Sequence, residues 1–233
     1  ITSGDLHTSS QTIHLGVSAG LTNQGTASVA VGYESGKTDQ GNYAVALGKN
    51  SGGITQSTQA VAIGNFAGYD TQGESCVAVG RSAGRENQSD FAVALGYQAG
   101  TLDAGINSIS IGKNAGQTNI AADSICIGEG TISTGINSIA IGKDATTAAF
   151  TNAVAIGNGA TTTANDEIGL GNASVSKFRI GGVLQPKLIY AGTGNITWSA
   201  GAGGSQRQHI FTNVSLPSGY SFWNIVATNL WGN

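Results

Sequence analysis

The side chains able to carry out acid–base or nucleophilic chemistry are few. The 233 residues include 13 Asp and Glu, 3 His and 2 Cys. Glycoside cleavage needs two carboxylates close together, yet residues 172–233 contain none. Earlier acids fall in predicted turns with no apolar pocket, so we interpret them as solubilising charges. They are Glu34, Asp39, Asp70, Glu74, Glu86 and Asp90. The sequence indicates no Ser–His–Asp or Cys–His arrangement. We therefore predict that the chain is not an enzyme and has no cofactor and no metal site.

Residues 172–233 instead carry groups suited to binding a sugar. Aromatic rings there offer flat apolar platforms, and Lys177, Lys187 and His209 could contact acidic groups of a glycan. The residues we predict to bind a ligand are Trp231, Tyr220, Arg207, Trp198 and Trp223. The alternative is that most of these aromatic rings, together with that of Phe222, form the core of a trimeric domain.

Cys76 and Cys126 both replace a small residue of a repeat described below. They lie three repeats apart, about 14 Å at the strand spacing of a β-sheet, which is too far for a disulfide within one chain. We predict buried free thiols, with an interchain bond conceivable if the small residues meet at a trimer axis. His14 occupies an equivalent position, and three copies could converge there on an anion or a metal, although packing or solvent contact is the simpler interpretation.

Composition and charge change near residue 171. The chain has 37 Gly, 2 Pro and only 10% charged residues, which is unusual for an ordinary globular domain. Residues 1–171 carry all 13 acids against 6 Lys and Arg, whereas residues 172–233 have 4 Lys and Arg, all three Trp and both Pro. No run of 18 apolar residues exists, so we expect no membrane insertion. We predict two domains, 1–171 and 172–233.

A five-residue unit, small–aliphatic–small–aliphatic–Gly, recurs through the first domain. Its eleven copies are residues 12–16, 28–32, 44–48, 60–64, 76–80, 92–96, 108–112, 124–128, 138–142, 153–157 and 167–171. The glycines are 16 residues apart seven times, and then 14, 15 and 14 apart. Strict alternation predicts a strand with one aliphatic face and one small face.

Three further columns follow the same period. Glycines four residues past each unit, from Gly20 to Gly116, predict turns with positive φ or close backbone approach. Gln24, Gln40, Gln56, Gln72 and Gln88 predict stacked amides that hydrogen-bond along the stack. The residues directly after each unit predict an exposed ladder, either a solvated surface or a ligand face. They are Tyr33, Lys49, Asn65, Arg81, Tyr97 and Lys113.

A single unit cannot bury its own apolar face, but stacked units can. One coil of two short strands and two turns fits 16 residues, and eleven coils would form a stack roughly 50 Å long. We expect the aliphatic residues to fill the inside of this roll and the small face to contact neighbouring chains. Because so thin a roll is marginal alone, we expect oligomerisation.

The units 28–32, 60–64, 138–142 and 153–157 read SVAVG, AVAIG, SIAIG and AVAIG. With their spacing of 14–16 residues, they resemble the YadA-like head of trimeric autotransporter adhesins. Similar repeats occur in bacteriophage and large-virus fibres. The resemblance covers about residues 12–171 and implies an all-β fold, a left-handed parallel β-roll (β-solenoid) with three chains side by side.

The second domain departs from that family, because neither heptad repeats nor a membrane strand follow the repeats. Short β-like runs at 187–190, 195–198, 209–214 and 222–227 predict a small β-rich trimeric tip. We therefore expect a homotrimeric attachment fibre of a virus or phage that binds a host cell-surface glycan or glycoprotein, and no nucleic acid. The alternatives are a bacterial trimeric autotransporter adhesin head and a purely structural fibre spacer. The expected location is the virion surface or the bacterial cell surface.

Overall fold

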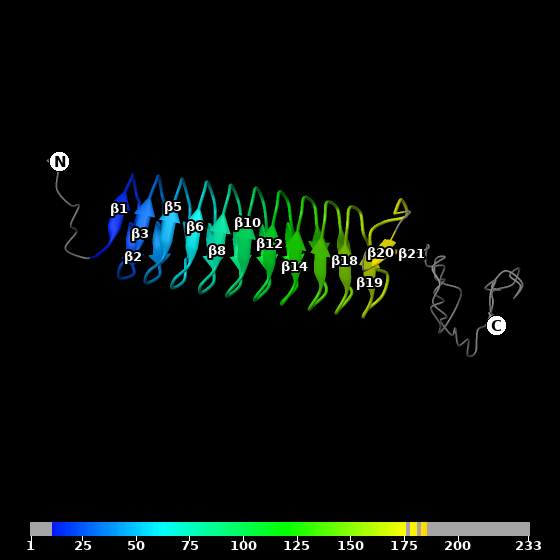
Figure 1. Ribbon diagram of the computed structural model, residues 1–233. Coiled ribbons are helices and arrows are strands. Elements are labelled where there is room, and N and C mark those ends of the chain that lie inside the picture. Colours follow the sequence, from blue (N-terminus) through cyan, green and yellow to red (C-terminus); the bar gives the residue numbers. More distant parts are fainter. Residues whose placement is uncertain (1–10, 176–177, 181–182, 186–233) are drawn as a thin grey trace, which may run out of the picture. The chain divides into compact units, whose positions relative to one another are not determined.

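The computed structural model describes residues 11–175, 178–180 and 183–185 of the chain. The chain divides into two compact units, Ile1–Asn172 and Ala173–Asn233, and each is described by itself. The described part of the first unit is a stack of coils, each built from short strands and tight turns (Figure 1). This arrangement agrees with the β-roll predicted from the repeat.

The first strands of successive coils form one parallel sheet of eleven strands that follows the order of the chain. They are β1 (Ile13–Leu15), β3 (Val29–Val31), β5 (Val45–Leu47), β6 (Val61–Ile63), β8 (Val77–Val79), β10 (Val93–Leu95), β12 (Ile109–Ile111), β14 (Ile125–Ile127), β16 (Ile139–Ile141), β18 (Val154–Ile156) and β19 (Ile168–Leu170). Each strand coincides with the alternating residues of one sequence unit, so their predicted positions are confirmed.

The second strands form the other side of the roll in shorter pieces, β2–β4, β7–β9–β11–β13 and β15–β17. They are β2 (Thr22–Gln24), β4 (Thr38–Gln40), β7 (Asp70–Gln72), β9 (Glu86–Gln88), β11 (Leu102–Ala104), β13 (Thr118–Ile120), β15 (Ile132–Ser133) and β17 (Thr146–Ala148). Single parallel bridges from Gln40 to Gln56 and from Gln56 to Gln72 continue the pairing between β4 and β7.

The spacing of the strand glycines first falls from 16 to 14 residues between Gly128 and Gly142, and this change lies in the first turn of the coil. Thr118 begins its strand six residues after Gly112, whereas Ile132 begins the equivalent strand four residues after Gly128. The parallel register of the first strands is kept across this change, because Ile125 pairs with Ile139. The roll therefore absorbs the missing residues in a turn, and the sheet continues without interruption.

The interior of the roll is lined by the small residues, which corrects the predicted orientation of the strands. Ala46, Ala62 and Ala78 are fully buried, whereas Leu47 is 43% exposed. The reason is the narrow gap between the two sides of the coil. A Cβ atom placed on Gly36 would lie 2.6 Å from Oε1 of Gln40 and 3.1 Å from Cβ of Ala30. Side chains of the opposite side already fill this space, so only small residues of the first strands fit there and their aliphatic residues lie on the outer face.

The glycine that ends each unit is required by both conformation and space. Gly64 has a φ of +128°, and a Cβ atom there would lie 2.6 Å from the carbonyl oxygen of Gly80 in the next coil. Gly68, of the second glycine column, has a φ of +49°. The predicted positive φ and close backbone approach are confirmed.

From Gln40 to Gln88 the glutamine column forms a hydrogen-bonded ladder inside the roll, whereas Nε2 of Gln24 donates to the carbonyl oxygens of Thr22 and Gly36. Nε2 of Gln40 donates to Oε1 of Gln56 at 3.0 Å, and Gln56 and Gln72 continue the ladder to Gln88 with bonds of 3.1 and 3.2 Å. Nε2 of Gln56 also donates to the carbonyl oxygen of Val45 at 2.9 Å. Because buried amides must be hydrogen-bonded, this ladder fixes the stacking register of the coils it joins.

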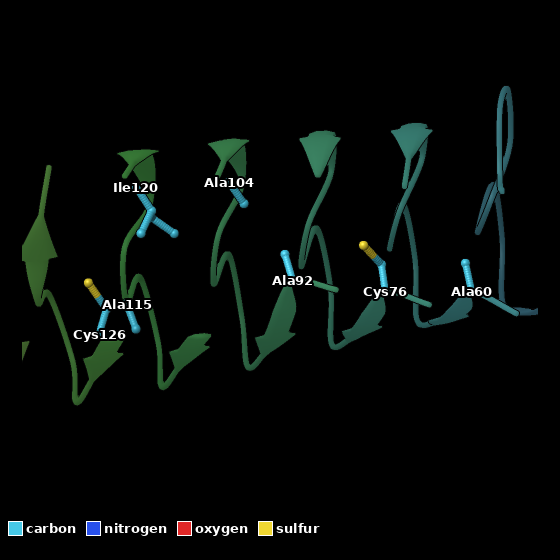
Figure 2. Packing of buried hydrophobic residues seen from close by; sticks show 7 residues of the cluster. All are labelled: Ala60, Cys76, Ala92, Ala104, Ala115, Ile120 and Cys126. Carbon is cyan, nitrogen blue, oxygen red and sulfur yellow. The ribbon is translucent and has the colours of Figure 1, made fainter. Parts of the chain in front are cut away.

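The same interior column becomes apolar beyond Gln88. Ala104 and then Ile120 occupy the equivalent register positions. Figure 2 shows their side chains on the side of the coil opposite Ala60, Cys76 and Ala92, within one buried cluster. The roll thus has an interior with amide hydrogen bonds over one part of its length and an apolar interior over another.

The described part of the second unit contains the antiparallel pair β20 (Phe178–Ile180) and β21 (Val183–Gln185). The β-like runs predicted between residues 187 and 227 lie outside the described residues. The domain boundary after residue 171 remains a prediction based on composition and charge.

Candidate interaction surfaces

The outer face of the eleven-stranded sheet is a continuous aliphatic surface. It consists of the first and third residues of every strand, which are all Val, Ile or Leu. Their fractional exposure reaches 63% at Leu15 and 68% at Ile168. A monomer rarely exposes so extended an apolar surface unless it serves an interaction. We refer to this surface as the aliphatic face.

A column of exposed side chains borders the aliphatic face at the carboxyl ends of its strands. Nζ of Lys49 lies 5.7 Å from the ring centre of Tyr33, and the guanidinium carbon of Arg81 lies 5.5 Å from that of Tyr97. Tyr33 and Tyr97 are 50% and 40% exposed. The exposed ladder predicted from the sequence is therefore present, although Asn65 within it is only half-exposed.

Two acids of the roll, Glu129 and Glu34, accept hydrogen bonds from lysine or amide groups. Oε1 of Glu129 accepts from Lys113 at 2.8 Å, and its other oxygen lies 3.9 Å from Lys143. Hydrogen bonding from Lys113 lowers the pKa of Glu129 below its ordinary value. In the same way, hydrogen bonds from Lys37 and then Asn50 lower the pKa of Glu34. Carboxyls with lowered pKa values are poor proton donors at neutral pH.

Cys76 and Cys126 are buried free thiols, as predicted. Both lie in the interior of the roll, where burial raises the pKa of each thiol to about 11. The sulfur of Cys76 donates to the carbonyl oxygen of Ser89 at 2.8 Å. Because the small face is the interior, an interchain bond through that face is not possible. Reactive thiols have a low pKa and are accessible to solvent. Cys76 and Cys126 have a raised pKa and are buried, so we expect them to be unreactive.

His14 lies in β1 in register with the interior residue Ala30. Its ring lies beside Gly20, where an added Cβ would meet the imidazole at 2.5 Å. This position corrects the idea that three copies converge through the small face. Among residues 11–175 and the two described strands that follow, no group of three or more His, Cys, Asp or Glu could hold a metal. The same residues contain no helix long and apolar enough to cross a membrane.

The predicted ligand residues Trp231, Tyr220, Arg207, Trp198 and Trp223 lie outside the described residues. Their role remains a prediction.

One set of surface residues escaped sequence interpretation, namely the position two residues before each first strand. It contains Tyr43 and Phe91, which are 60% and 52% exposed. Both have positive φ, at 59° and 61°. The sequence did contain a signal for this surface, because Tyr43 and Phe91 stand at a position that small or polar residues occupy in the other coils. That signal can be interpreted only when the adjacent aliphatic face is known to point outward.

The described residues thus form a stack of parallel coils with an outward aliphatic face, which defines a β-roll. The family model of the YadA head domain repeat matches residues 89–115, 121–145, 133–160 and 151–166. The chain therefore carries YadA-like head repeats, as the sequence resemblance indicated.

A solved structure supports the same fold. The roll is similar to the crystal structure of the collagen-binding domain of the Yersinia adhesin YadA, with 19% sequence identity and a TM-score of 0.50. That similarity covers 79% of this chain and 90% of the other. No curated protein matches the chain.

Proposed function

We propose that this chain is a segment of a non-enzymatic, homotrimeric attachment fibre that binds a host cell-surface glycan or glycoprotein. The observation that carries the proposal is the aliphatic face, which runs along the whole described roll of a YadA-like repeat. The fibre would be displayed on a virion or on a bacterial cell surface, and its left-handed rolls would lie side by side.

The aliphatic face supports trimerisation by the hydrophobic effect. Burial of apolar area contributes about 25 cal/mol per Å², and the face repeats over eleven strands. Covering Leu15, Leu47, Leu95 and Ile156 with the same face of two other copies would remove the largest exposed apolar surface of the roll. A closed ring of three leaves no aliphatic face open to further association.

In this proposal the roll is a stiff spacer and residues 172–233 form the receptor-binding tip. The proposed ligand residues are Trp231, Tyr220, Arg207, Trp198 and Trp223. A trimer would present three copies of a weak site, and multivalent contact raises the overall affinity without any new contact.

Cell-binding and glycan-array measurements with the trimeric chain would test this function. Trp231→Ala together with Arg207→Ala should lower binding at least tenfold, while sedimentation still shows the same oligomer. Thr118→Ala together with Ile132→Ala, exposed on the second strands of the roll, is the matched control and should leave binding unchanged. If the roll variants lose binding and the tip variants keep it, the tip is not the site.

Collagen is a second ligand to measure, because the similar Yersinia domain is described as collagen-binding. Collagen bound by the chain and lost in the roll variants would place recognition on the roll.

The alternative function is a purely structural spacer. The unbroken ladders of Gln40 to Gln88 and of the strand glycines favour it, since they serve rigidity alone. A chain without residues 183–233 discriminates between the two: a spacer would lose only trimer stability, whereas an attachment fibre would lose receptor binding.

A further inference from the structure

Two columns of side chains border the aliphatic face, one on each side. The carboxyl-side column follows the glycine that ends each first strand, and the amino-side column lies two residues before each first strand. The carboxyl-side column is Tyr33, Lys49, Asn65, Arg81, Tyr97, Lys113, Glu129, Lys143 and Asn158. The amino-side column is Ala27, Tyr43, Gln59, Ser75, Phe91, Asn107, Asp123, Asn137, Asn152 and Asp166.

The two columns carry opposite charge. All six Lys and Arg residues between positions 11 and 175 lie in the first turn, either in the carboxyl-side column or four residues after it. The amino-side column contains no Lys or Arg, includes Asp123 and Asp166, and is directly preceded by Glu74 and Asp90. One border of the aliphatic face is therefore cationic and the other acidic.

Aromatic residues occur in both columns, and in one coil they occupy both borders. Strand β10 is bordered by Phe91 before it and Tyr97 after it, and β5 is bordered by Tyr43 and Lys49. Lys49 and Arg81 are held over tyrosine rings, with Nζ of Lys49 and Cζ of Arg81 at 5.7 and 5.5 Å from the ring centres. Both cations are thus placed to accept a further aromatic or acidic neighbour.

The backbone of the amino-side column adds an independent observation. Every residue in it has φ between +54° and +61°, a conformation that Asn and Asp tolerate and bulky residues rarely adopt. Tyr43 and Phe91 hold this conformation while more than half exposed, and their backbone N–H groups donate to the carbonyl oxygens of Thr26 and Glu74 in the preceding coil, both at 2.9 Å. The roll itself therefore fixes these backbone angles and holds both exposed aromatic residues beside the aliphatic face.

We propose that these columns form the seam between neighbouring copies of this chain, with the carboxyl-side column of one copy packed against the amino-side column of the next. The inference rests on the proposed trimer and names the residues that set its register. Opposite columns meet only when the chains are parallel and the contact is heterologous, which is the arrangement that closes into a ring.

The register follows from the chemistry of the pairs. With parallel copies at equal height, each carboxyl-side residue lies between two amino-side residues of its neighbour. Lys113 then lies near Asp123, and Arg81 lies near Phe91. Glu129 is already neutralised by Lys113 and Lys143 of its own chain, so it does not repel the neighbour's Asp123.

Cysteine cross-linking tests the seam, because the two columns are far apart within one chain. Asn107 donates to Asp123 at 2.9 Å on the amino side, and Lys113 contacts Glu129 at 2.8 Å on the carboxyl side. The chain from Asn107 to Lys113 runs along β12 and advances six residues, at most roughly 20 Å, so a disulfide between positions 113 and 123 cannot form within a chain.

The test variant is Lys113→Cys with Asp123→Cys, in a background with Cys76→Ala and Cys126→Ala. On oxidation, most of the protein should migrate as covalent dimers and trimers on a non-reducing gel. Lys113→Cys with Ser75→Cys is the matched control, since position 75 lies in the same column three coils away, and it should remain monomeric on the gel. Circular dichroism establishes that each variant folds.

The possible outcomes test the proposed seam and the proposed trimer separately. If sedimentation shows a trimer but the test pair does not cross-link, or the control pair cross-links equally, the seam is wrong and the trimer stands. If sedimentation shows a monomer, the proposed trimer fails as well. A cysteine at 113 that reacts freely with a maleimide in the trimer would show that the carboxyl-side column faces solvent or another ligand, which also overturns the seam.

Discussion

The side-chain amide of Gln56 donates to Oε1 of Gln72 at 3.1 Å, with both side chains fully buried between the two sides of the coil. The two residues are 16 positions apart, so this hydrogen bond ties one coil to the next. A β-roll of Ala and Gly buries little apolar volume per coil. Amide ladders of this kind supply specific coil-to-coil bonds in its place.

We expect Gln56→Ala to destabilise the roll by about 3 kcal/mol, because it leaves a cavity and removes the partners of Gln40 and Gln72. Denaturant unfolding followed by circular dichroism measures the loss. Ile120→Ala, at an apolar position of the same column, is the control that loses volume alone. An equal loss in both variants would show that the ladder bonds add nothing beyond packing.

The strand glycines should not tolerate a methyl group. Gly64→Ala should cost more than about 2 kcal/mol, since the Cβ would meet the carbonyl oxygen of Gly80 and separate the coils. Gly159→Ala is the matched control. Its φ of +60° is also unfavourable for alanine, but the added Cβ would lie 3.4 Å from its nearest neighbour, Nδ2 of Asn172. Its expected cost is about 1 kcal/mol. Similar midpoints for both variants in thermal unfolding would contradict the clash.

The two faces of a first strand should respond differently to substitution. Ile63→Lys on the aliphatic face should leave the β-sheet spectrum unchanged and abolish the trimer in sedimentation, because a charge cannot be covered there without a partner. Ala62→Val, one residue away in the interior, should destabilise the coil by about 1–3 kcal/mol through overpacking. Loss of fold in the Lys variant and tolerance of the Val variant would reverse the assigned faces.

The buried thiols should make the roll less stable at alkaline pH. Burial raises the pKa of Cys76 and Cys126 to about 11, whereas a thiol in the unfolded chain has a pKa of about 8.5. Between these values the unfolded chain binds fewer protons than the folded one, so the free energy of unfolding falls as pH rises from about 9 towards 11.

Two measurements check this expectation. The folded protein should not react with a disulfide reagent at pH 8, whereas the denatured protein should release two equivalents. Cys76→Ala with Cys126→Ala should flatten the alkaline decline of the denaturant midpoint. Rapid labelling of either thiol in the folded roll would show that it is exposed.

The period of the repeat predicted most of the fold. Alternation over five residues predicted each first strand, the glycine columns predicted the turns with positive φ, and the glutamine column predicted the ladder. These inferences hold because backbone geometry imposes them locally: a strand has a period of two, and a left-handed turn favours glycine. The free state of Cys76 and Cys126 followed from spacing along the stack alone.

The sequence by itself thus determined that the chain forms a stack of coils in which each strand has an aliphatic face and a small face. Only the tertiary structure decided which face is inside. Alternation is symmetric between the two sides of a strand, so Val45 and Ala46 are equally consistent with either orientation. The second side of the coil already contributes Gln40 to Gln88 and Ile120 to the interior, so only small residues of the first strands fit beside them. The aliphatic face is thereby left outside, with its two charged borders.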